Sequence, residues 1–191
     1  MKNSSNIIFK LFLTISLLIS LSSTAWADPK VLFKTTKGDF VVELNPEKAP
    51  ITVENFLSYV NSGFYSGTIF HRVINGFMVQ GGGFTQNMQE KTTKAPIALE
   101  SRNGLKNLKY TIAMARTGDP NSATAQFFIN VRDNSRLDYP SPDGFGYAVF
   151  GKVISGTEVI EDIKFSPTTV VRGMSDVPVN KITIESATLL K

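Results

Sequence analysis

The chain has 191 residues, of which 20 are basic and 16 acidic, with one histidine and no cysteine. The lack of cysteine excludes disulfides, thiolate nucleophiles and cysteine-ligated zinc, and a single histidine excludes most histidine-rich metal sites. No lysine–arginine run and no basic stripe with interleaved aromatic residues occurs, so nucleic acid is not an expected partner.

Residues 1–27 have the pattern of an export signal. Two lysines precede an apolar run at residues 11–21, and the segment ends with Ala25-Trp26-Ala27. The run is short and serine-rich for a membrane span, and no basic stop-transfer cluster follows, which argues against the alternative of an uncleaved membrane anchor. We therefore expect cleavage after Ala27, no membrane span after processing, and localisation in a bacterial periplasm or outside the cell.

Cleavage would leave residues 28–191, a single domain of 164 residues. The removed segment contains two of the basic residues and no acidic residue, so 18 basic and 16 acidic side chains remain and the formal charge is +2. This length suits one well-buried core, and without disulfides that core alone must stabilise the exported domain. We expect a monomer.

The predicted elements begin with a hairpin. Residues 31–36 and 39–44 alternate between apolar and polar side chains and are joined at Lys37-Gly38, where the glycine suits a tight turn. Pro50 then opens a segment whose apolar residues fall at helical spacing until Gly63. An antiparallel sheet followed by one amphipathic helix is expected.

Short strands are predicted after this helix, because apolar runs alternate with clusters of glycine, proline, asparagine and aspartate. These strands are residues 69–74, 77–81, 97–99, 110–115, 127–131 and 147–153. Residues 156–165 again show helical spacing, and residues 181–190 alternate as a closing strand. Many short strands indicate a barrel or a sandwich.

The candidate functional residues are concentrated in one strand-like segment. Arg72 and Gln80 are interleaved with Phe77 and Met78, and neither an acidic residue nor a cysteine lies near them. Such a set suits an apolar group, such as a proline ring, held beside a hydrogen-bonded peptide group, and it does not suit proton transfer or metal binding. Each residue alone also has a structural explanation, as core, ion pair or satisfied amide, and His71 is expected to be a packed strand residue.

The same segment ends in three glycines, Gly81-Gly82-Gly83. A phosphate-binding loop is not expected, because no lysine–serine or lysine–threonine pair follows and no helix begins there. The glycines are instead expected to allow a sharp turn or the close approach of a peptide backbone.

Four segments match the signatures of one family in order and approximate spacing: FHRVI at 70–74, GFMVQGG at 76–82, QFFI at 126–129 and VFGKV at 149–153. On these residues the sequence resembles the cyclophilin family of peptidyl-prolyl cis/trans isomerases. Residues 81–85, 112–116 and 145–148 look most like its secreted bacterial branch. The resemblance implies a mainly β fold, a closed eight-stranded antiparallel barrel capped by two α-helices, with the active site on an outer face and no cofactor.

The resemblance also implies roles for individual residues. Arg72 would be the principal catalytic residue, assisted by Gln80, and both Gln80 and Gln126 would orient the substrate backbone. Ala115 and the backbone of Arg116 would lie along the peptide groove. The proline ring would be held by four apolar side chains, namely Phe77, Met78, Phe128 and Leu137.

Three substrate-binding positions depart from the best-known family pattern. Arg136 stands where an aromatic residue usually borders the pocket, Tyr147 where many members have histidine, and Arg116 where many have asparagine. Because the position of Arg116 contributes mainly through its backbone, the side-chain change is expected to be tolerated. The cation of Arg136 predicts weak cyclosporin binding and a preference for an acidic residue near proline.

The predicted function is the acceleration of rotation about X-Pro bonds in exported proteins, with proline-containing unfolded or flexible polypeptides as partners. The alternative is a chaperone or adaptor that holds such segments with little catalysis, and the presence of both Arg72 and Gln80 favours the enzyme. A peptide hydrolase is not expected, because no Ser-His-Asp set can include the only histidine without disrupting the sheet.

Overall fold

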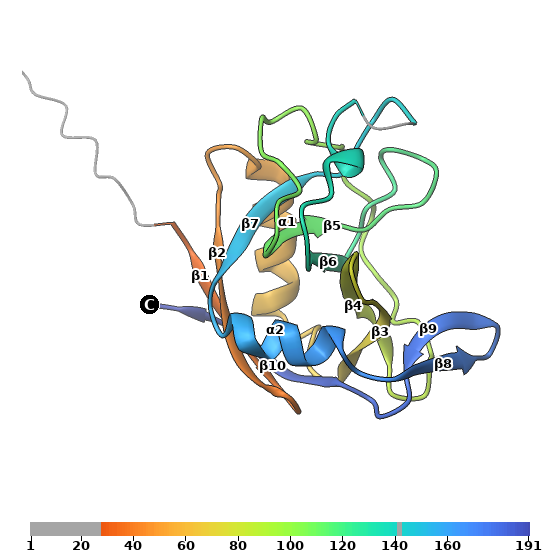
Figure 1. Cartoon of the computed structure of the whole chain (residues 1–191). Coiled ribbons are helices and arrows are strands. Elements are labelled where there is room, and N and C mark those ends of the chain that lie inside the picture. The colour runs from red at the N-terminus through yellow and green to blue at the C-terminus, as the bar shows by residue number, and fades with distance from the viewer. Residues whose placement is uncertain (1–27, 141–142) are drawn as a thin grey trace, which may run out of the picture.

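The computed structural model describes residues 28–140 and 143–191 (Figure 1). The barrel strands are β1 Lys30–Thr35, β2 Gly38–Leu44, β3 Thr68–Ile74, β4 Met78–Thr85, β5 Thr111–Met114, β6 Phe127–Asn130, β7 Val149–Ser155 and β10 Thr183–Leu190. Within the described residues these eight strands close in the order β1-β10-β3-β4-β6-β5-β7-β2, and every neighbouring pair is antiparallel. The closed barrel confirms the predicted fold class. The predicted export signal, residues 1–27, lies outside the described residues.

Two α-helices, α1 Pro50–Asn61 and α2 Thr157–Lys164, pack against the barrel together with a short 3-10 helix, η1 Ser135–Leu137. As predicted, α1 begins at its proline. The Glu100 carboxylate accepts hydrogen bonds from the backbone N–H groups of Ile51 and Thr52, at 3.1 and 2.8 Å, and so satisfies two of the donors at this helix end. Neither helix in the described part of the chain is long and apolar enough to cross a membrane.

The interior of the barrel is filled with aromatic side chains. The rings of Phe33 and Phe40 stack with centroids 4.8 Å apart, and the Phe127 ring lies 5.5 Å from that of Phe33. Phe56 of α1 reaches the same cluster, 5.0 Å from Phe150. Since all five rings are buried, the barrel is a packed core and a peptide can bind only on its outer surface.

A β-bulge in β3 determines which side chains reach that surface. Phe70 pairs with Gly81 while Arg72 pairs with the preceding residue of β4, Gln80, so His71 is one extra residue on β3. Phe70 and Val73 both belong to the interior cluster. In a regular strand Arg72 would share the inward face of Phe70, and the extra residue turns the guanidinium outward instead.

The prediction of a strand at residues 97–99 is wrong. This segment forms only an isolated bridge, between Ile97 and Ala123. A closed barrel has no free edge at which an additional strand could pair, so a short apolar run outside it remains a loop.

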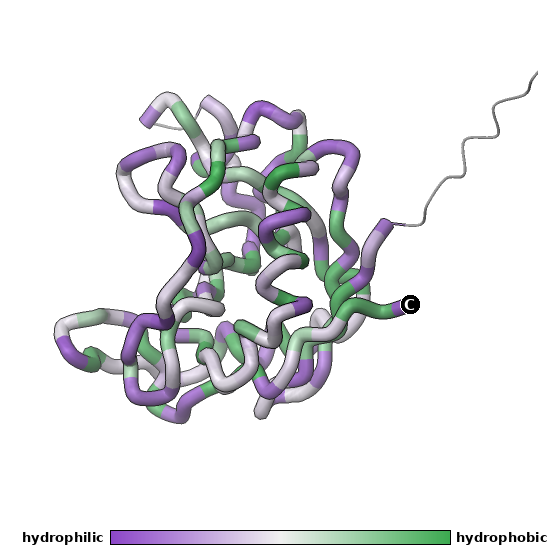
Figure 2. Tube along the Cα trace, turned by 180° about the vertical axis from the view of Figure 1, so that it is seen from behind, coloured by the Kyte–Doolittle hydropathy of each residue, from purple (hydrophilic) through white to green (hydrophobic). Residues whose placement is uncertain are grey.

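The structure also contains a hairpin that was not predicted, β8 Thr168–Val171 and β9 Met174–Pro178. It stands beside the barrel and carries hydrophobic residues on its strands (Figure 1, Figure 2). Val177 is buried against Ile69 of β3 and Met88, which anchors the hairpin to the outer side of the barrel. Prolines at both ends, Pro167 and Pro178, weaken the strand signal in the sequence.

The bulge residue predicts a pH dependence of stability. His71 is 4% exposed and its ring lies 4.6 Å from that of Phe84. Burial, with a smaller effect of the Arg72 charge, lowers the pKa of His71 from 6.5 to about 4. In the unfolded chain the imidazole takes up its proton near pH 6.5, whereas in the folded protein it does so only near pH 4. The contribution of the neutral His71 to the free energy of unfolding is therefore fully present above pH 6.5 and is lost as the pH drops towards 4, by roughly 3 kcal/mol.

Urea unfolding measured between pH 7 and pH 4.5 tests this expectation. His71→Gln should flatten the pH dependence in that window even if it lowers stability at every pH. Glu161, whose hydrogen bond with Lys164 lowers its pKa to about 2, contributes a loss only below about pH 4.5 and does not interfere. An identical slope in the wild type and the variant would contradict the assignment to His71.

Candidate active site

Strand register brings the candidate residues together in one row. Arg72 of β3 pairs with Gln80 of β4, Gln80 pairs with Phe128 of β6, and Phe128 pairs with Ala113 of β5. Directly paired residues of antiparallel strands point to the same face of the sheet. The row therefore lies on the outer face, while the neighbouring row of Val73, Val79, Ile129 and Ile112 faces the core.

The row borders a hollow of about 250 Å³ on the barrel surface. Met78 and Phe128, which are 2% and 5% exposed, pack with Ala113 and Val149 beneath it. The hollow is lined by Arg72, Phe77, Met78, Gln80, Ala115, Arg116, Phe128, Leu137 and Tyr147. Nine of the eleven sequence-predicted site residues thus meet in one place, with a guanidinium beside an apolar pocket.

A chain of amide hydrogen bonds extends from this guanidinium along the surface. Arg72 Nη1 lies 3.5 Å from Gln80 Oε1, a long and weak hydrogen bond. Gln80 Nε2 donates to Gln126 Oε1 at 3.0 Å, and Gln126 Nε2 donates to Glu90 Oε1 at 3.2 Å. Gln126 and Glu90 line a second hollow that adjoins the first at Gln80, so the predicted residue Gln126 lies next to the hollow beside Arg72.

The three glycines make room for side chains. Gly82 has φ +83°, and a Cβ there would lie 2.8 Å from the Phe127 ring and 2.9 Å from the Tyr65 ring. At Gly83 a Cβ would lie 2.4 Å from Gln126 Cγ. The expected close approach at the glycines is therefore that of the protein's own side chains, and Gly83 allows Gln126 to lie over β4.

The Arg116 side chain has a structural role that the sequence did not indicate. It is 2% exposed, and its Nε and Nη2 atoms donate to the Gly146 carbonyl at 3.0 and 2.9 Å. Its guanidinium also pairs with Asp143 and lies 4.4 Å from the centre of the Tyr147 ring. The side chain thus connects the loop at residues 143–147 to the edge of the hollow, and the Tyr147 ring in turn packs edge-on against Phe128.

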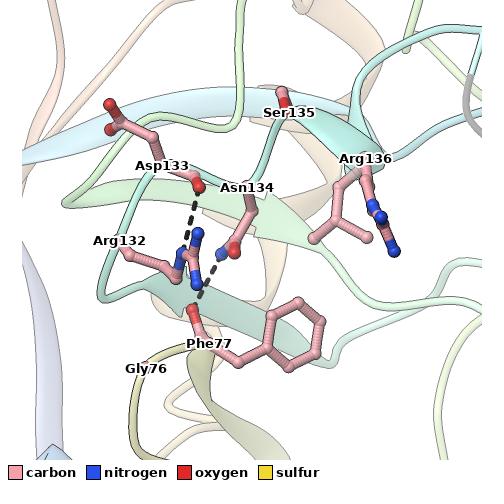
Figure 3. A pocket seen from close by; sticks show the side chains of 8 residues that line it. Gly76, Phe77, Arg132, Asp133, Asn134, Ser135 and Arg136 are labelled. Carbon is pink, nitrogen blue, oxygen red and sulfur yellow. Dashed lines mark hydrogen bonds between the residues drawn. The ribbon is translucent and has the colours of Figure 1, made fainter.

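Arg136 does not line the hollow beside Arg72. It is exposed and borders a separate hollow together with Arg132, which the sequence analysis did not single out (Figure 3). Phe77 and Leu137 line both hollows and therefore join them. Arg132 had no sequence signal beyond its proximity to Arg136, because a single exposed arginine is common on any surface.

The chemistry available at this site is hydrogen bonding and apolar contact. In the described part of the chain no group of three or more His, Cys, Asp or Glu side chains is placed to hold a metal ion. His71 is buried in the bulge with its pKa lowered, and it does not line the hollow beside Arg72. The arrangement suits stabilisation of a polar group by the fixed Arg72 cation rather than proton transfer.

Comparison with known proteins identifies the class of this fold. The family model described as cyclophilin type peptidyl-prolyl cis-trans isomerase/CLD matches residues 30–189. The chain therefore belongs to the cyclophilin family, and it is a peptidyl-prolyl cis-trans isomerase.

Two bacterial proteins are similar in sequence over most of this chain. A peptidyl-prolyl cis-trans isomerase of Streptomyces antibioticus is 59% identical over 162 residues, which cover 84% of this chain and 98% of the relative. Peptidyl-prolyl cis-trans isomerase B of Escherichia coli strain K12 is 53% identical over 161 residues, covering 83% and 98%. A crystal structure of a cyclophilin-type isomerase from Cryptosporidium parvum matches with a TM-score of 0.71 at 28% identity, covering 86% of this chain and 98% of that one. The two bacterial relatives support the bacterial part of the predicted secreted bacterial branch.

The contact at Gly83 gives a prediction about Gln126. In Gly83→Ala the new methyl group would displace the Gln126 side chain, which can rotate away without unfolding the barrel, and the hydrogen bond to Gln80 would be lost. Since such a bond contributes about 1 kcal/mol, kcat/KM should fall roughly three- to tenfold while the melting temperature changes little.

The matched control is Gly118→Ala, because that glycine has open space around its Cβ position. A coupled assay of cis-to-trans conversion in an X-Pro peptide measures both variants. Wild-type kcat/KM in Gly83→Ala would show that Gln126 has no part in catalysis.

Proposed function

We propose that the isomerase turns X-Pro bonds of exported polypeptides in the hollow beside Arg72. The observation that supports this site most directly is the pairing of Arg72, Gln80 and Phe128 across neighbouring strands. Arg72 and Gln80 lie next to the apolar floor formed by Met78 and Phe128. The site is complete within one chain, which is consistent with a monomer.

The chemical task is the loss of amide resonance. Partial double-bond character gives the peptide C–N bond a rotational barrier of about 18–20 kcal/mol, and uncatalysed X-Pro exchange takes on the order of tens to hundreds of seconds. No covalent bond is broken during rotation. The enzyme therefore needs only to stabilise a twisted amide whose prolyl nitrogen has lost conjugation and carries a lone pair.

Arg72 is proposed to donate a hydrogen bond to that nitrogen. A planar amide nitrogen is a poor acceptor, so the bond becomes strong only as the amide twists, which raises turnover rather than merely tightening substrate binding. Arginine stays charged and offers donors in a fixed plane. The weak 3.5 Å hydrogen bond to Gln80 orients this plane while other N–H groups remain for the substrate.

The remaining site residues would hold the peptide while one side of it rotates. The space for the proline ring, the proline pocket, is surrounded by Phe77, Met78, Phe128 and Leu137. Gln80 and Gln126, linked at 3.0 Å, present amide groups to the flanking backbone alongside Ala115 and Arg116. A fixed ring and a fixed backbone on one side leave the other side free to turn.

The exported role is proposed from the leader pattern at residues 1–27. Slow prolyl isomerisation limits the folding of polypeptides after export as it does elsewhere, so an isomerase that follows them into the periplasm would accelerate their folding. No cysteine is present, so the enzyme itself needs no oxidative folding step in that compartment.

Replacement of Arg72 tests the proposed mechanism. Arg72→Ala should lower kcat roughly 30- to 1000-fold with a much smaller change in peptide affinity, because the lost hydrogen bond forms only in the twisted state. Turnover of an X-Pro peptide and binding of the same peptide by calorimetry separate these two effects. Arg172→Gln, which removes one charge from the turn between β8 and β9, serves as the control.

A chaperone or adaptor that works without catalysis would behave differently. In that case Arg72→Ala would weaken peptide binding by the same factor as it lowers turnover. The variant would also be less able to prevent the aggregation of an unfolded protein. Equal losses in binding and turnover would therefore assign Arg72 to ground-state binding and contradict the transition-state role.

The position of the mature terminus tests the export proposal. Ala25 and Ala27 occupy the small-residue positions of a cleavage site, and β1 begins at Lys30, so the mature protein should start at Asp28. Mass spectrometry of the protein from a periplasmic fraction measures this directly. An intact terminus at Met1, or a start beyond Val31 inside β1, would contradict it.

A further inference from the structure

We propose that the hollow bordered by Arg132 and Arg136, next to the proline pocket, binds an acidic side chain of the polypeptide substrate through these two arginines. The inference rests on the proposed site at Arg72. The hollow that Arg132 and Arg136 border is seen from close by in Figure 3. It has a volume of about 430 Å³ and shares Phe77 and Leu137 with the proline pocket. A peptide whose proline lies against these two side chains continues directly into it on one side.

The charge of this hollow is unbalanced. Among the residues that the structure describes, no carboxylate lies within 4 Å of the Arg132 or Arg136 guanidinium. Arg132 Nε donates to the backbone carbonyl of Asp133, at 3.3 Å. The Asp133 carboxylate accepts a hydrogen bond from the backbone N–H of Lys109 at 2.8 Å. It points away from the Arg136 side chain (Figure 3). Both cations are therefore available to an anionic group of a ligand.

The backbone that carries these arginines is fixed relative to the proline pocket. Asn134 is buried, and its Nδ2 donates to the Phe77 carbonyl at 2.8 Å and to Asn130 Oδ1 at 2.7 Å. These bonds tie the segment from Arg132 to Arg136 to the turn before β4 and to the end of β6. The cations thus stay close to the bound proline, and only their side-chain rotamers must be ordered when a ligand binds.

The opposite end of the groove carries an acidic side chain. Glu90 lines the hollow beyond Gln80 and Gln126, on the far side of the proline pocket from the arginines. A substrate with an acidic residue on the arginine side is attracted, whereas the same residue on the other side approaches Glu90. We therefore expect a preference for acidic residues on one side of proline only.

Short peptides with one Ala-Pro bond test the proposal. Glutamate, glutamine or lysine is placed in turn at each of the nearest positions on both sides of the Ala-Pro pair, and kcat/KM is measured by exchange NMR. At about 20 mM salt the glutamate peptide should exceed its glutamine counterpart roughly three- to tenfold at a position on one side only, and lysine should be disfavoured there. At about 500 mM salt the ratio should approach one, because exposed charges are screened.

The ratio of glutamate to glutamine turnover is also measured in variants. Arg132→Gln and Arg136→Gln should each lower it, and the double variant should bring it to about one. Arg172→Gln removes the same charge from the β8–β9 turn and should leave it unchanged. A ratio near one in the wild type at low salt, or a raised ratio that persists in the double variant, overturns the proposal.

Arg72→Ala, measured with the neutral glutamine peptide, separates this inference from the proposed function. If that variant retains full turnover, the catalytic site is not at Arg72 and both fail. If turnover is lost in Arg72→Ala but the wild type shows no preference for glutamate, only the acidic subsite is overturned.

Discussion

The outward position of Arg72 is the constraint on which the functional surface depends. The barrel interior is packed with phenylalanine rings, and an arginine in that interior would lose hydration that no partner there replaces. One extra residue in β3, His71, reverses the alternation after Phe70 and turns the guanidinium to the surface. The neighbouring strands need no such device, because Gln80 and Phe128 already alternate outward in regular register.

The packed interior gives the surface its rigidity. Side chains of the outer row stand on strands whose opposite face contacts a close-packed core, so the donor and the apolar pocket keep their relative positions without substrate. The proposed catalysis by hydrogen bonding to a twisted amide requires this rigidity, because a donor that must first reorganise loses much of its advantage. The segment at 132–137 and the loop held by Arg116 border this row of side chains.

Much of the fold could be predicted from short-range patterns. The hairpin at 31–44, the helix beginning at Pro50 and most barrel strands follow from period-two or helical spacing and from turn residues, which are local properties of the chain. The run at 97–99 has a similar pattern but no strand edge to pair with, and β8 and β9 are obscured by flanking prolines. Pairing partners, rather than local preference, decided these cases.

The sequence by itself determined the residue types of the site, because Arg72, Gln80 and the apolar residues near them form a family pattern with defined spacing. Only the tertiary structure decided how these residues meet: the bulge at His71, the space that Gly83 leaves for Gln126, and the buried position of the Arg116 guanidinium. It also placed Arg132 and Arg136 around one hollow that adjoins the hollow beside Arg72. Each of these depends on contacts between strands and loops that are distant in the chain, and a sequence pattern does not contain the register that brings them together.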